Sequence, residues 1–168
     1  DAELSDHSVP GRGRHPLPSA ESLQDSARRW GLHPGDPVVV YDDWNSQAAG
    51  RAWWLLRAAG LTDVRILDGG WSAWQAAGLP TESGDVTPQR GSVVIATLDA
   101  MPVATADEVA AQSESTTHAV LDARATARYR GDEEPLDPRA GHIPGAVSAP
   151  TADNVTAEGT FRPAADLR

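Results

Sequence analysis

Three short, largely apolar runs, each followed directly by an aspartate, constrain the fold of this chain more than any other feature. The runs cover residues 38–41, 64–67 and 119–121, and the aspartates are Asp42, Asp68 and Asp122. The first run is continuous and rich in β-branched residues, which is typical of a strand buried on both faces of a parallel sheet. The second run predicts another strand, and the third predicts a buried strand. Helical patterns lie between them, and strands that alternate with helices predict α/β units. The sequence therefore predicts an α/β fold.

The helices are predicted from apolar spacing and from end signals. Residues 19–30 place Leu23, Ala27 and Trp30 on one face, with Ser19 as N-cap and Gly31 after the end. Further helices are predicted at 47–59, 71–77 and 105–112. The last of these begins with a capping-box pattern. Residues 81–91 are polar, contain Pro and Gly, and predict a linker, and residues from 92 onward predict extended chain.

Composition excludes several classes of partner. The chain has 168 residues, 40% of them apolar, which is enough for one ordinary domain with a sizeable core. The net charge of −10 argues against a nucleic-acid backbone or an anionic membrane surface as the main partner. No apolar run approaches the ~18 residues of a transmembrane helix. We expect a cytoplasmic protein with neither nucleic-acid nor membrane partners.

Cysteine and histidine usage limits the cofactors. The chain has no cysteine, which excludes disulfides and thiolate metal sites within these residues. Its five histidines show no ligand spacing, and no nucleotide-binding fingerprint is present, so we expect neither a metal nor another cofactor. The chain starts without Met and stops where a helix is predicted to begin, so we expect a fragment of a longer protein.

The polar residues after the third apolar run form the candidate site. Ligands of open α/β sheets gather outside the carboxyl ends of the strands. Arg124 and Arg128 follow Asp122 closely there, and a guanidinium suits an oxyanion. For Arg128, residue chemistry alone leaves two interpretations open, an anion ligand or an ion pair with Glu133 or Glu134.

Two sets of motifs resemble the rhodanese-type sulfurtransferases in their tandem form. One set is LDGGWSAW at 67–74 with AGLP at 77–80, and the other is LDAR at 121–124, RYRG at 128–131 and GHIPGAV at 141–147. The resemblance implies a parallel sheet flanked by helices in each of two tandem domains. It places the later part of a first, non-catalytic domain at 1–80, the linker at 81–91 and the earlier part of a second, catalytic-type domain at 92–168.

The resemblance also implies a reaction. Family members move sulfane sulfur from thiosulfate or 3-mercaptopyruvate to a thiophilic acceptor, such as cyanide or a thiol, through a cysteine persulfide. A small anionic sulfur donor and a thiophilic acceptor are the partners so implied. The catalytic cysteine of the family lies on a later loop of the second domain, so these 168 residues alone are expected to be inactive. Asp42 stands at the corresponding cysteine position of the first domain.

The same resemblance assigns roles within the candidate site. Arg128 matches the arginine that binds the sulfonate or carboxylate of the donor. Asp122 and Arg124 match a pair that orders the strand-end loop. His142 is expected to support the site through a hydrogen bond to backbone near Asp122, in preference to a catalytic role.

Other interpretations remain open at this point. Asp42 and Asp43 could form an acid–base pair, although strand-end aspartates often cap the following helix. The whole protein could be a non-catalytic rhodanese-like binding or regulatory module, or a rhodanese-like phosphatase. The tandem layout and the Asp-Gly-Gly-Trp segment speak against the phosphatase. The sequence does not separate thiosulfate from 3-mercaptopyruvate as donor.

Overall fold

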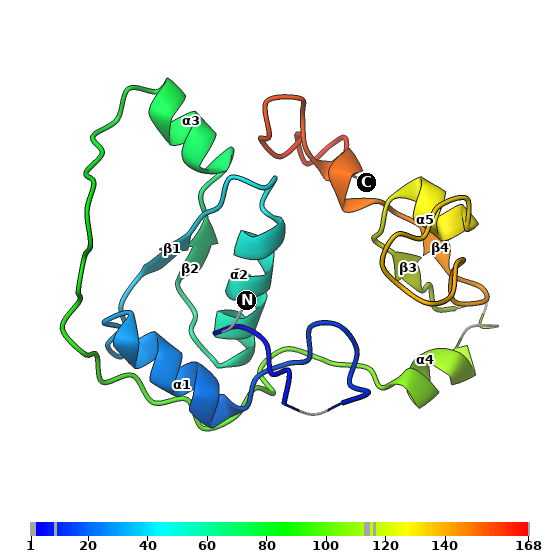
Figure 1. Cartoon of the computed structure of the whole chain (residues 1–168), viewed down its shortest axis with the longest axis horizontal. Helices are drawn as coiled ribbons and strands as arrows, with labels where there is room; N and C mark the ends of the chain where they lie inside the picture. The colour runs from blue at the N-terminus through cyan, green and yellow to red at the C-terminus, as the bar shows by residue number, and fades with distance from the viewer. Residues whose placement is uncertain (1–2, 9, 113–114, 116, 168) are drawn as a thin grey trace. The chain divides into compact units, whose positions relative to one another are not determined.

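The computed structural model describes residues 3–8, 10–112, 115 and 117–167, and it divides into two compact units, Asp1–Pro102 and Val103–Arg168. The first unit contains α1 (Ala20–Arg29), β1 (Val38–Val40), α2 (Gln47–Ala58), β2 (Val64–Ile66) and α3 (Gly70–Ala76) (Figure 1). The second contains α4 (Ala106–Gln112), β3 (Leu121–Asp122), α5 (Thr126–Arg130), β4 (Val147–Ser148) and the 3-10 helix η1 (Thr151–Asn154).

Both units are built on a pair of parallel strands. In the first, β1 pairs with β2, with Val38 opposite Val64. Parallel neighbours need a crossover connection, and here the crossover is α2, which lies against both strands (Figure 1). The indole N–H of Trp53 on α2 donates to the carbonyl of Val64 at 3.0 Å. In the second unit β3 pairs with β4 around the short α5, with Leu121 opposite Val147. The predicted α/β fold with parallel strands and flanking helices is confirmed.

The predicted end signals form the contacts that the sequence indicated. The hydroxyl of Ser19 accepts from the N–H of Ser22 at 3.0 Å, and Gly31 follows α1 with φ of +88°. At α4 the hydroxyl of Thr105 accepts from the N–H of Glu108, whose carboxylate accepts from the N–H of Thr105 at 2.6 Å. This reciprocal pair is a complete capping box.

The core of the first unit includes a segment that the sequence assigned to the second domain. Its buried cluster contains Leu23, Ala27, Leu55, Val93 and Ile95. Val93 and Ile95 reach this cluster because the chain leaves α3 and returns along α1 as a long extended segment (Figure 1). The structural division therefore falls after Pro102, later than the predicted linker at 81–91. The assignment of the chain to two tandem domains stays a prediction.

Backbone and side-chain hydrogen bonds hold this extended segment against α1. The N–H of Gly91 donates to the carbonyl of Arg28 at 2.8 Å, and the guanidinium of Arg28 donates to the carbonyl of Val93 at 2.8 Å. The N–H of Ile95 donates to the side chain of Gln24 at 3.0 Å. The segment forms no strand, and it bonds to α1 and to Leu32 just after that helix, whose carbonyl accepts from the N–H groups of Ser92 and Val93.

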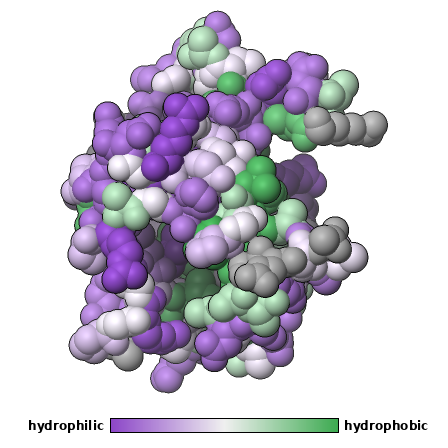
Figure 2. Space-filling view, turned by 90° about the vertical axis from the view of Figure 1, so that its right-hand side faces the viewer, coloured by the Kyte–Doolittle hydropathy of each residue, from purple (hydrophilic) through white to green (hydrophobic). Residues whose placement is uncertain are grey.

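The predicted burial of the strands on both faces is wrong. Val39 and Tyr41 are 58% and 57% exposed, and Leu121 is 63% exposed. The two sheets that the structure describes have only two strands each, so each strand keeps an open edge and incomplete cover. Figure 2 shows a largely hydrophilic face of the molecule, with apolar side chains in separate patches. Among the described residues, no helix has both the length and the apolar character to cross a membrane.

Replacing Gly91 by alanine should destabilise the first unit. A Cβ at this position would lie 2.0 Å from the carbonyl oxygen of Leu32. That atom is backbone and cannot rotate away, so we expect a loss of about 1–3 kcal/mol, the usual cost of overpacking. Urea unfolding followed by tryptophan fluorescence measures the loss.

Gly50→Ala is the matched control, because nothing lies within 4 Å of a Cβ at Gly50 in α2. It should be neutral or stabilise by roughly 0.5–1 kcal/mol, the helical preference for alanine over glycine. Equal stability of the two variants would contradict the close approach at Gly91.

Candidate functional site

The candidate site lies at the carboxyl end of β3, where the predicted residues of the second unit meet. Asp122 ends the strand, and its carboxylate accepts from the guanidinium of Arg124 at 2.9 Å and 2.6 Å and from the Arg124 N–H at 3.0 Å. The Arg124 hydrogen bond, against a smaller opposing effect of burial, holds the pKa of Asp122 below its ordinary value. The pair is therefore charged and well ordered at neutral pH.

Arg124 also connects the strand end to the following turn. Its Nη2 donates to the carbonyl of Gly141 at 2.6 Å, seventeen residues along the chain. One guanidinium thus contacts both Asp122 and the backbone of the 141–147 segment. The predicted role of this pair in ordering the loop is compatible with these contacts and stays a prediction.

Glu134 is the centre of the charged cluster, whereas sequence analysis named it only as one of two alternative ion-pair partners of Arg128. Its Oε1 accepts from Arg128 Nη2 at 2.8 Å and from the main-chain N–H groups of Leu136 and Asp137 at 3.1 Å and 2.9 Å. Its Oε2 lies 3.3 Å from Arg128 Nε and 3.5 Å from Arg124 Nη1. The side chain is only 5% exposed. No periodic pattern marks a glutamate inside a proline-containing loop, which is why its burial was not predicted.

The hydrogen bonds to Glu134 change its acidity strongly. The N–H of Asp137 contributes most and the guanidinium of Arg128 next, and together they lower the pKa of Glu134 to about 2. A carboxylate that accepts several N–H bonds favours its charged form. Glu134 therefore stays ionised through the physiological range and fixes both arginines.

Arg128 lies in α5 and forms the ion pair that the sequence left open as an alternative. Besides Glu134, its Nη2 donates to Oδ2 of Asp137 at 2.9 Å. The Arg128 side chain is 19% exposed, and that of Asp137 is 44% exposed. The predicted binding of an anion by Arg128 is not excluded by these pairs, because a guanidinium has five donors. It stays a prediction.

His142 packs on Tyr129. Its Nδ1 lies 2.7 Å from the carbonyl oxygen of Tyr129, and the two rings stack with centroids 3.9 Å apart. A carbonyl oxygen only accepts, so Nδ1 of His142 is the donor in this hydrogen bond. The backbone bond was expected near Asp122, and the acceptor is the end of α5 instead. The hydroxyl of Tyr129 donates to the carbonyl of Ala146 at 2.9 Å.

Arg139 is a further cation near the candidate site, and sequence analysis did not single it out. A cavity of about 310 Å³ is lined by Asp122, Arg124, Arg139, Ala140, Gly141, His142 and Ile143. Within the part of the chain that the structure describes, Arg139 forms no ion pair or hydrogen bond. The lining of the cavity therefore includes the guanidinium of Arg139 as well as the Asp122–Arg124 pair. Its only sequence signal was its position in the arginine-containing loop.

Asp42, the fifth predicted site residue, belongs to the first unit and follows β1. Its Oδ1 accepts from the N–H groups of Trp44 and Ser46, both at 2.9 Å, and its Oδ2 accepts from the N–H of Ala49 at 2.8 Å. Burial alone would raise the pKa of Asp42, but these N–H bonds outweigh it and hold the pKa below its ordinary value. Asp42 thus caps the start of α2.

The carboxylate of Asp43 points to a different element. It accepts from the hydroxyl of Ser72 in α3. Because Asp42 and Asp43 contact different helices, their carboxylates are not paired, and the acid–base interpretation finds no support. Gly70, at the start of α3, lies so close that a Cβ there would be 2.2 Å from the Asp42 carbonyl. Only a glycine at position 70 permits this close approach of the two backbones.

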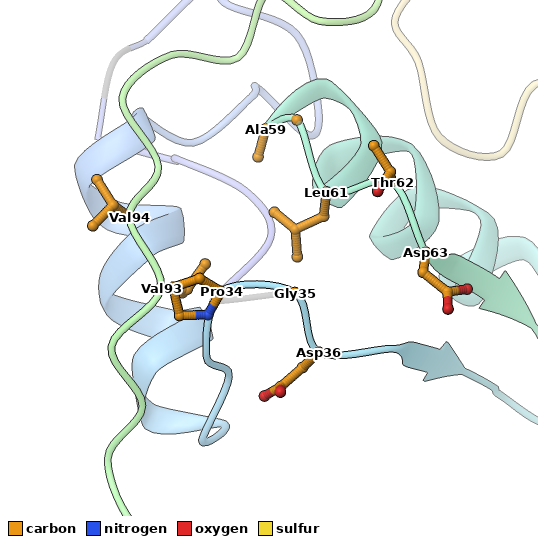
Figure 3. Close-up of a pocket in the computed structure, with 10 residues that line it drawn as sticks. Pro34, Gly35, Asp36, Ala59, Leu61, Thr62, Asp63, Val93 and Val94 are labelled. Atoms are coloured by element: carbon orange, nitrogen blue, oxygen red, sulfur yellow. The ribbon is translucent and has the colours of Figure 1, made fainter.

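Another groove in the first unit lies at the opposite ends of the strands. It measures about 260 Å³ and is lined by residues 34–36, 59–63, Val93 and Val94. Figure 3 shows Asp36 and Asp63 where the chain leads into β1 and β2, with Val93 and Val94 on the extended segment. This is the amino end of the strands, where α/β ligand sites are not expected. No group of three or more metal-ligating side chains occurs among the described residues, and the expectation of no metal stays a prediction.

Glu134→Gln should remove part of the acid sensitivity of the second unit. A carboxyl whose pKa is lowered on folding contributes stability that is present above its unfolded pKa. That contribution is lost as the pH falls toward the folded value of about 2. The variant should be less stable than the wild type at pH 7, and the difference should shrink between about pH 4.5 and pH 2. Urea unfolding at a series of pH values measures both.

Glu133→Gln is the control, because Glu133 is exposed and its carboxylate has no hydrogen bond or ion pair within the described residues. It should keep the pH dependence of the wild type. A constant difference between Glu134→Gln and wild type at every pH would contradict the charged state assigned to Glu134.

Known proteins resemble this chain along nearly its whole length. Residues 7–77 match the rhodanese-like domain. SseB of Mycobacterium tuberculosis, whose name assigns it to the thiosulfate sulfurtransferases, is 50% identical over 95% of this chain and 56% of its own length. Human 3-mercaptopyruvate sulfurtransferase is 38% identical over 92% of this chain and 53% of its own. The chain thus spans about half the length of the curated relatives it matches.

A solved structure extends the likeness to the fold. The crystal structure of SseA from Escherichia coli, a 3-mercaptopyruvate sulfotransferase with the rhodanese fold, superposes with a TM-score of 0.84 at 36% identity. The match covers 99% of this chain and 62% of that one. Together with the parallel strand pairs, these similarities show that the chain has the rhodanese fold and contains a rhodanese-like domain at residues 7–77.

Proposed function

We propose that the protein containing this chain is a sulfurtransferase, which moves sulfane sulfur from thiosulfate or 3-mercaptopyruvate to a thiophilic acceptor such as cyanide or a thiol. The observation that carries the proposal is the 50% identity to a thiosulfate sulfurtransferase over 95% of the chain. The arginine cluster at the end of β3 supports it, because both donors are small anions. We propose a cytoplasmic location as well.

The reaction needs a nucleophile that these residues do not contain. A cysteine thiolate would attack the outer sulfur of thiosulfate, the S–S bond would break, and sulfite would leave with the electron pair. An acceptor such as cyanide would then take that sulfur and regenerate the thiolate. The 168 residues have no cysteine, so this step requires residues outside them. The 168 residues alone should be inactive.

The part that this chain contributes is the binding of the donor's anionic group. Arg128 is the proposed anchor, since charge-assisted bonds from guanidinium to an oxyanion are among the stronger hydrogen bonds. Asp122 and Arg124 hold the loop around it, and Arg139 adds an unpaired cation at the neighbouring cavity. His142 supports the site by its bond to Tyr129.

The first unit is proposed to be non-catalytic. Asp42 occupies the position at which a family cysteine would stand, and a carboxylate cannot carry a persulfide. Its oxygens already accept the N–H groups of the following loop. The same observation favours the second candidate function, a rhodanese-like module that binds or regulates without catalysis. That function would apply if the whole protein also lacks a cysteine in its later loop.

A thiocyanate assay tests the sulfurtransferase. At the full length of its relatives, the protein should form thiocyanate from thiosulfate and cyanide, whereas the 168 residues should give only the uncatalysed background. Thiocyanate formation by the 168 residues would contradict the requirement for a cysteine. A full-length protein without activity toward either donor would favour the binding module.

Arg128→Ala in the full-length protein tests the anchor. Removing one charge-assisted contact of about 1.5–3 kcal/mol should raise KM for thiosulfate by roughly 10- to 100-fold, with a smaller effect on kcat. Arg130→Ala is the matched control, because Arg130 is exposed on the same helix and has no ion pair with another described residue. Equal KM values for the two variants would exclude Arg128 as the anchor.

A further inference from the structure

The hydrogen bonds of Arg128 divide its guanidinium into two sides. Glu134 takes the side formed by Nε and Nη2, at 3.3 Å and 2.8 Å. A planar guanidinium presents a second pair of donors at its end, on Nη1 and on the other hydrogen of Nη2. Oδ2 of Asp137 lies 2.9 Å from Nη2 and so occupies this end.

The two carboxylates differ in how firmly they are held. Glu134 is 5% exposed and accepts N–H bonds from the backbone and from two arginines. Asp137 is 44% exposed at its side chain, and exposed ion pairs are weak. An anion that reaches Arg128 would therefore displace Asp137 and leave Glu134 in place.

An oxyanion would hold this end of Arg128 better than Asp137 does. Two oxygens of a carboxylate, a sulfonate or thiosulfate can accept from Nη1 and Nη2 together, whereas Asp137 contacts Nη2 through one oxygen. Paired, charge-assisted bonds are stronger than single ones. We propose that Asp137 is an internal competitor for the oxyanion site on Arg128, and that it sets the affinity of the protein for its anionic sulfur donor.

This inference rests on the proposed anion-binding role of Arg128. If Asp137 competes with the donor, removing its charge should tighten binding of the donor. Removing a residue with a purely structural role would not tighten binding. The comparison needs a variant that removes the same charge nearby. Asp132→Asn is suitable, because Asp132 lies in the same loop, is exposed, and its carboxylate has no ion pair with any described residue.

Isothermal titration of the 168-residue chain with sodium thiosulfate tests the proposal, at constant ionic strength with chloride as background. Asp137→Asn should lower the Kd about two- to fivefold, the change that corresponds to an exposed ion pair. Asp132→Asn should change the Kd less, because Arg128 forms its ion pairs with Glu134 and Asp137 and, among the described residues, none with Asp132. Asp137→Ser gives a second variant in case the asparagine perturbs folding, which circular dichroism checks.

A double mutant shows whether the effect passes through Arg128. On an Arg128→Ala background, Asp137→Asn should no longer change the Kd. If the wild type binds through Arg128 but Asp137→Asn behaves like Asp132→Asn, the inference is overturned and the proposed anchor stands. If Arg128→Ala binds as well as the wild type, the anchor itself fails, and the inference with it. Absence of binding in wild type and Asp137→Asn alike overturns both.

Discussion

Parallel pairing of short strands is the constraint on which both units depend. A parallel neighbour cannot be reached by a tight turn, so the chain must cross over between β1 and β2 and between β3 and β4. The crossover places the carboxyl ends of both strands at the same edge. At the carboxyl ends of the strands in the first unit Asp42 caps α2, and at those in the second unit Asp122 binds Arg124. The polar contacts at these strand ends therefore follow from the topology, and in the first unit the opposite ends of the strands border the groove of Figure 3.

In the second unit, ion pairs and hydrogen bonds hold α5 and the loop after it, which have few buried apolar side chains. Helix α5 has no buried residue, yet its Arg128 is held by Glu134 and its Tyr129 by the carbonyl of Ala146. Glu134 is nearly buried and accepts backbone N–H groups as well as guanidinium groups. A buried carboxylate with these partners orders a loop that has few apolar side chains. The ordered loop then carries Arg139 to the edge of the cavity beside Asp122.

The sequence predicted the elements whose signals are local. The caps of α1 and α4 and the glycine after α1 depend on residues within a few positions of a helix end. It did not predict α5 and β4, which are five and two residues long and too short for a periodic pattern. The burial of Glu134 and the exposure of Val39 depend on contacts between distant residues and on the number of strands, and neither has a local signal. For the same reason the docking of Val93 and Ile95 on α1 was not anticipated.

That docking has a consequence for the order in which the chain folds during its synthesis. Leu23, Ala27 and Leu55 leave the ribosome early, but the two residues that complete their cluster, Val93 and Ile95, follow some forty residues after Leu55. Contacts between residues far apart in sequence form late, because the loop between them must close first. The nascent chain therefore exposes part of its apolar core until the extended segment emerges and lies down along α1. Apolar surface that is exposed in this interval is prone to aggregation.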